Sequence, residues 1–88
     1  MDNTLLINAR VEIVASFHTG TDVLQICFPA KMRYKNQLID FSELGLRHPT
    51  MQGKRMIHAF DMSDGVNDYR LEFDAESLTW TLVSILEG

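Results

Sequence analysis

The chain has 88 residues, of which 45% are hydrophobic and 23% charged, and its formal net charge is −4. This length suits one domain with a modest core, and the acidic excess argues against general affinity for nucleic acid or anionic membranes. Cys27 is the single cysteine, so no disulfide can form within the chain, and a reducing cytoplasm is the simplest location. No run approaches the ~20 apolar residues of a membrane helix, and the first residues lack the basic start of a signal peptide.

The first long pattern is an alternation. From Leu5 to Phe17 every odd position is apolar, which predicts a strand. β-branched residues in this run favour a strand over the helix that an N-terminal cap could also start. After a turn, Val23–Phe28 is predicted to return as the second strand of a long hairpin. Pro29 would end that strand or place it at a sheet edge.

A second hairpin is predicted over Lys31–Phe41, around a turn at Asn36, because asparagine tolerates the left-handed backbone of a tight turn. Residues 42–46 predict at most one helical turn, which a serine could cap and Gly45 could end. Residues 50–54 are expected to form a loop.

The C-terminal third predicts three further strands. Arg55–Met62 alternates, and the Asp64-Gly65 pair that follows favours a hairpin turn. Residues 68–85 read DYRLEFDAESLTWTLVSI, which is two alternating runs around a turn. Trp80, the single tryptophan, is expected to be the largest side chain of the core.

Together these elements predict one all-β domain over residues 1–88. We expect a six-stranded antiparallel meander that curls into a small barrel or half-barrel, because short connections favour antiparallel neighbours. Closure of the sheet would remove its exposed edges. A domain this small is marginally stable alone, so the sequence also allows a homodimer.

No pattern in the sequence is typical of a catalytic, cofactor or metal site. The three histidines have no partner at a ligand spacing. The acidic stretch Asp61–Asp68 resembles a calcium loop, but its glycine comes at the fifth position instead of the sixth, and its twelfth position is Glu72 inside a predicted strand. Cys27 has no basic neighbour that would activate its thiol. We therefore expect no enzyme activity, no cofactor and no metal.

The charged residues are segregated along the chain. Residues 31–55 hold six basic and two acidic side chains, whereas residues 61–76 hold one basic and six acidic side chains. These are either two solvated faces or a polarised surface that meets an acidic partner or a second copy. Tyr34 either belongs to the core or offers a ring on which nucleobases could stack. The candidate interaction surface consists of Lys31, Arg33, Tyr34, Lys35, Arg47, Lys54 and Arg55.

The run DYRLEFDAESLTWTL resembles the closing hairpin of small uncharacterised prokaryotic β domains, which pair a Y/F-R-L/V-x-F/Y-D strand with a W-x-L strand. The earlier MRYKNQLIDF is similar to another hairpin of those domains. The resemblance covers about the last 60 residues, and it implies a compact β domain without naming any site residue.

The sequence therefore favours a small cytoplasmic interaction module that binds a protein partner or itself. The alternative is single-stranded nucleic-acid binding through the basic segment 31–55, which the net charge disfavours. A small-ligand binder or enzyme would need a polar pocket containing His48 or His58. No membrane association is expected.

Overall fold

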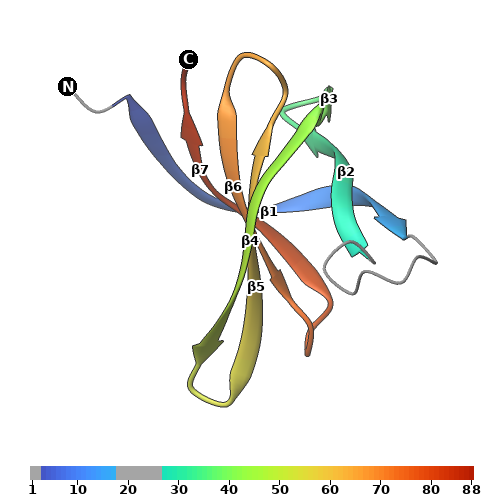
Figure 1. Cartoon of the computed structure of the whole chain (residues 1–88), viewed down its shortest axis with the longest axis vertical. Helices are drawn as coiled ribbons and strands as arrows, with labels where there is room; N and C mark the ends of the chain where they lie inside the picture. Colours follow the sequence, from blue (N-terminus) through green and yellow to red (C-terminus); the bar gives the residue numbers. More distant parts are fainter. Residues whose placement is uncertain (1–2, 18–26) are drawn as a thin grey trace.

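The structure is a computed structural model that describes residues 3–17 and 27–88, and in residues 16–17, 27–28 and 44–47 it describes the backbone alone. This part of the chain contains seven strands (Figure 1). The strands are β1 (Thr4–Phe17), β2 (Cys27–Tyr34), β3 (Gln37–Asp40), β4 (Glu43–Gln52), β5 (Arg55–Ser63), β6 (Asp68–Asp74) and β7 (Thr79–Leu86). The predicted all-β class is therefore confirmed, but the predicted number of six strands is too low. The predicted turn and strand over residues 18–26 lie outside the described residues.

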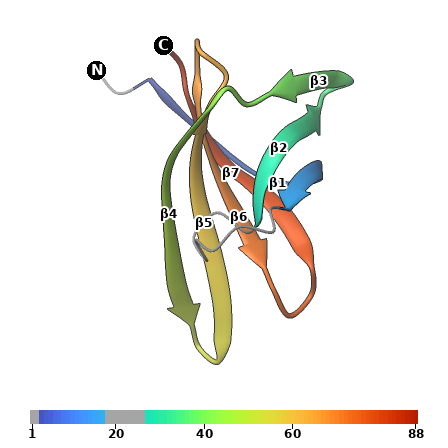
Figure 2. The same cartoon turned by 45° about the vertical axis from the view of Figure 1, so that its right-hand side comes forward.

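All seven strands form one antiparallel sheet in the order β3-β2-β1-β7-β6-β5-β4. The long β1 joins two meanders, because its first half pairs with β7 and its second half with β2. Strands β3 and β4 follow one another in the chain but lie at opposite edges of the sheet, so the sheet must coil until the end of β3 comes near the start of β4 (Figure 2). The sheet does not close, so of the predicted barrel or half-barrel the closed form is wrong.

Strand β4 replaces the predicted helical turn at 42–46 and the predicted loop at 50–54. It pairs antiparallel with β5 from Glu43 to Gln52. The sequence obscures this strand, because Gly45 and Pro49 interrupt its alternation and proline cannot donate a ladder hydrogen bond. An edge strand tolerates proline on its open side, and β4 is the edge of this sheet.

Pro29 does not end a strand, because β2 continues through it to Tyr34, but β3 pairs with β2 only over Lys31–Tyr34, so Pro29 has a strand partner on one side alone, as the predicted edge position requires. It is fully buried within β2 and pairs with Ala15, while Lys31 pairs with Val14, so Ala30 forms a bulge between them. A bulge leaves an unpaired position in the ladder, which is where a sheet accepts a proline. The β2–β3 turn at Asn36 is confirmed, with positive φ angles at both turn residues (50° and 63°).

The core lies on the inner face of the coiled sheet. Its buried side chains are Met32, Phe60, Met62, Tyr69, Leu71, Leu82 and Ile85. Trp80 is only partly buried, with its ring centre 4.7 Å from that of Phe73 and 5.5 Å from that of Phe60. The tryptophan therefore packs against the buried core without being one of its buried side chains, whereas the sequence predicted it as the largest side chain of the core.

Bulges cross the sheet in one band and change which residues face outward. Val83 is an extra residue of β7, because Arg70 pairs with Ser84 while Leu71 pairs with Leu82. Residues 7–8 of β1 and 45–46 of β4 are irregular at the same level of the sheet. Bulges increase the local twist of a strand, so this band accounts for the sharp coiling of the sheet and for the shape of its outer face.

Candidate functional site

The seven residues of the predicted interaction surface fall on separate parts of the fold. Lys31, Arg33 and Tyr34 lie on β2, Lys35 in the β2–β3 turn, Arg47 on β4, Lys54 in the β4–β5 turn and Arg55 at the start of β5. Strands β1, β7 and β6 separate β2 from β5 in the sheet. The two turns lie at different ends of the molecule in both views (Figures 1 and 2). The structure thus brings the first four residues together on one hairpin and leaves Lys54 and Arg55 apart from them.

Most of the described basic side chains in this set have acidic partners. The ion pairs are Lys31–Asp40 (3.4 Å), Arg33–Glu12 (3.8 Å), Arg55–Asp74 (3.0 Å) and Arg55–Glu76 (3.3 Å). Lys35 places its Nζ 5.4 Å from the centre of the Tyr34 ring, which itself packs partly buried against the core. Arg55 joins the basic segment to the acidic one, so the charge separation seen along the chain is reduced in the fold.

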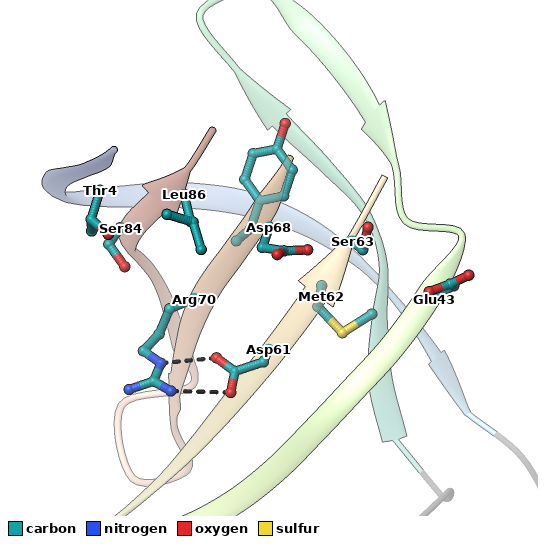
Figure 3. A pocket seen from close by; sticks show the side chains of 10 residues that line it. Thr4, Glu43, Asp61, Met62, Ser63, Asp68, Arg70, Ser84 and Leu86 are labelled. Atoms are coloured by element: carbon teal, nitrogen blue, oxygen red, sulfur yellow. Dashed lines mark hydrogen bonds and ion pairs between the residues drawn. The ribbon is translucent and has the colours of Figure 1, made fainter. Parts of the chain in front are cut away.

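A hollow of about 500 Å³ lies on the outer face of the sheet, at the level of the bulges (Figure 3). Its lining residues come from β1, β4, β5, β6 and β7: Thr4, Glu43, Asp61, Met62, Ser63, Asp68, Tyr69, Arg70, Ser84 and Leu86. Most of its wall is apolar. A recess of this size can hold a side chain or a small ligand.

One side of the hollow is formed by the ion pair between Asp61 of β5 and Arg70 of β6, which face each other across the ladder. Arg70 donates two parallel hydrogen bonds to the carboxylate, from Nε to Oδ1 (2.9 Å) and from Nη2 to Oδ2 (3.0 Å). His48 of β4 places Nε2 3.3 Å from Asp61 Oδ2. The bonds from Arg70 are the main reason that the pKa of Asp61 lies below its usual value, and burial opposes this shift.

The loop between β5 and β6 is held by Asp64. Its Oδ1 accepts hydrogen bonds from the amides of Val66 (2.9 Å) and Asn67 (2.8 Å), and its Oδ2 accepts one from the Tyr69 hydroxyl (2.9 Å). Burial disfavours the ionised Asp64, but the hydrogen bonds outweigh it and the pKa of Asp64 is lowered. Burial raises the pKa of Tyr69. This network fixes the loop from which Asp68 enters β6 beside the hollow.

A second, polar recess lies on the outer face beyond the bulges. Arg55 and Asp74 contribute to it, together with Arg10, Gln52, Ile57, Glu72, Ser77, Thr79 and Thr81. Burial opposes ionisation of Asp74, but hydrogen bonds from the amides of Glu76 and Ser77 outweigh it and lower the pKa of Asp74. The recess therefore holds two basic and two acidic side chains whose charges balance, and its Arg55–Asp74 ion pair links the start of β5 to the β6–β7 turn.

The small-ligand hypothesis needs a polar pocket that contains His48 or His58. Neither histidine lines the first hollow. His48 contacts Asp61 from the neighbouring strand β4, and His58 lies on β5 opposite Phe73 of β6. Within residues 3–17 and 27–88 there is no group of three side chains that could hold a metal ion. In the same part of the chain, no helix could cross a membrane.

Comparisons with family models, with curated proteins and with solved structures yield no match. The resemblance to small prokaryotic β domains therefore stays a prediction. The hollow has to be interpreted from its own geometry and chemistry.

The sequence carried part of the signal for this hollow. Asp61, Asp68 and Arg70 occupy the polar positions of alternating runs, so their place on the outer face follows from the period of two. Ser84 and Leu86 face the same way only because the bulge at Val83 shifts the alternation of β7. No local pattern predicted that bulge or the pairing of β1 with β7.

Proposed function

We propose that this protein is a small interaction module that binds a partner protein through the hollow on its outer face. The observation that supports this most directly is an apolar recess next to solvent-exposed aliphatic side chains. Leu6 is 77% exposed and Leu86 is 43% exposed. Leu6 pairs with Ser84, and Leu86 follows two residues later on the same face. Exposed apolar surface with a polar rim is typical of protein interaction sites.

A separate partner fits this surface better than a second copy. A two-fold contact centred on the hollow would bring Glu43 and Asp68 close to the same carboxylates of the other copy, and like charges at an interface are costly. A head-to-tail contact between the hollow and the basic β2–β3 turn would leave an open surface at each end and produce chains of molecules. We also place the protein in the cytoplasm, because Cys27 has no second cysteine with which to pair.

Two tryptophan substitutions test the proposal. Ser84→Trp fills the hollow, whereas Thr81→Trp adds the same side chain to the outer face of the same strand beyond the bulge. Partner proteins are captured by chemical cross-linking to the wild type and to each variant. We expect Thr81→Trp to keep the partners of the wild type and Ser84→Trp to lose them. Circular dichroism checks that both variants are folded. Equal capture by all three proteins would contradict the proposal. Sedimentation of the wild type as a dimer that Ser84→Trp dissociates would replace the partner with a second copy.

Nucleic-acid binding through residues 31–55 remains the alternative. The ion pairs of Lys31, Arg33 and Arg55 weigh against it, because a paired cation releases fewer counterions from a phosphate backbone. The alternative predicts binding to single strands that weakens steeply with salt. The absence of a gel shift at low salt would exclude it.

A further inference from the structure

The charges around the hollow indicate the chemistry of the group that it binds. Asp61 and Arg70 form a bidentate pair and neutralise each other. Glu43 and Asp68, which also line the hollow, make no ion pair with any cation in the described part of the chain. Among the described side chains, the lining therefore carries two carboxylates without an ion-pair partner above a largely apolar wall.

An apolar wall with the carboxylates of Glu43 and Asp68 at its rim complements a long basic side chain. Lysine and arginine have an aliphatic stem that packs against apolar surface and a charged end that stays near water and acidic groups. A carboxylate or phosphate ligand would meet the repulsion of Glu43 and Asp68, and a purely apolar group would leave these carboxylates without compensation.

We propose that the hollow binds a lysine or arginine side chain from an extended segment of the partner. This inference rests on the proposed function and adds the chemical identity of the partner segment. The aliphatic stem packs beside Leu86, and the cationic end lies between Glu43 and Asp68, which come from β4 and β6.

The neighbouring leucines add a second feature of the partner segment. In an extended chain, residues two apart point to the same side and lie about 6.8 Å from each other. When a basic side chain occupies the hollow, the residue two positions away therefore faces the exposed side chains of Leu6 and Leu86. The segment that fits best carries an aliphatic residue two positions from its basic residue.

Peptide titration followed by nuclear magnetic resonance tests this proposal. The probes are three short blocked peptides with leucine at both ends, threonine at the second and fourth positions, and lysine, norleucine or glutamate at the centre. We expect the lysine peptide to shift the backbone amide signals of Asp68, Ser84 and Leu86 saturably, while the other two leave them unchanged at equal concentration. Norleucine keeps the length of the stem without the charge, so it isolates the ionic contribution.

Two double variants provide the matched comparison. Glu43→Gln with Asp68→Asn removes the two rim charges, and we expect the affinity for the lysine peptide to fall by roughly three- to tenfold, as for two exposed ion pairs. Glu12→Gln with Glu72→Gln changes the net charge equally but leaves the lining of the hollow intact. This control should keep the affinity of the wild type within a factor of about two.

Three outcomes would overturn the inference. Equal binding of the norleucine peptide would show an apolar docking site without charge selection, and the interaction module itself would stand. Shifts centred on other acidic residues would show general charge attraction. Absence of any shift at the hollow would remove the basic side chain as its ligand, while the comparison of Ser84→Trp with Thr81→Trp would still decide the proposed function separately.

Discussion

The two faces of strands β5, β6 and β7 differ in chemistry, although their side chains alternate along the same stretches of chain. The inner face carries Phe60, Leu71 and Leu82, which are almost completely buried. The outer face carries the Asp61–Arg70 ion pair and the hollow. These three inner side chains follow the regular alternation of their strands, which directs every second residue into the core. The outer face takes its shape from where the strands are irregular.

The largest expected effect comes from the inner face. Leu82→Ala removes a side chain with no exposed surface, and we expect the free energy of unfolding to fall by about 3 kcal/mol. Thr81→Ala, one residue away on the outer face, should cost less than about 1 kcal/mol. Urea denaturation of both variants measures this difference. Equal costs would contradict the assignment of the two faces.

Deletion of Val83 tests whether the bulge has a role in the coiling of the sheet. Without this residue Leu82, Ser84 and Ile85 follow one another in regular alternation, so Ser84 still faces outward and Ile85 inward, and only the extra twist of the bulge is lost. We expect the free energy of unfolding to fall by about 2 kcal/mol, because a flatter β7 fits the coiled sheet less well. Urea denaturation measures the loss, and Val83→Ala, which keeps the bulge, should be the milder change. A deletion variant that is more stable than Val83→Ala would show that the bulge has no role in the coiling of the sheet.

Asp61→Asn is expected to have a smaller effect, because it acts on the outer face. The substitution weakens both hydrogen bonds from Arg70 and the contact with His48. Since Asp61 is 32% exposed, we expect a loss of about 1 kcal/mol in thermal or urea unfolding. Glu72→Gln, on the outer face of the adjacent strand, serves as the control and should be close to neutral. A loss of stability as large as that of Leu82→Ala would show that Asp61 contributes as much to the free energy of unfolding as a core residue, against this prediction.

The smallest effect concerns pH. The pKa values of Asp61 and Asp64 are lower in the folded protein than the ordinary value of 3.8, so the native state binds fewer protons than the unfolded state in acid. Their contribution to stability is present above this value and is lost as the pH falls through the lowered pKa values. We expect urea midpoints to decline from about pH 4 downward, and to decline less steeply in Asp61→Asn. An unchanged slope would show that Asp61 makes no such contribution.

Much of the strand content could be predicted from the sequence. Strands β1, β5, β6 and β7, and the β2–β3 hairpin with its turn at Asn36, all follow from local alternation and turn chemistry. Strand β4 could not, because Gly45 and Pro49 break its pattern and only its place at the sheet edge makes them acceptable. Of the candidate site, the outward direction of Asp61, Asp68 and Arg70 was predictable, whereas the hollow between them was not.

By itself, the sequence determined that the chain forms strands, which side chains face a core where the alternation is regular, and where the tight turns fall, since these depend on the alternation of neighbouring residues and on local backbone preferences. The tertiary structure alone decided that β1 lies between β2 and β7, that the sheet stays open, and that residues of five strands meet around one hollow. The physical reason is that strand pairing and the band of bulges depend on hydrogen bonds between residues far apart in the chain, which no local pattern specifies.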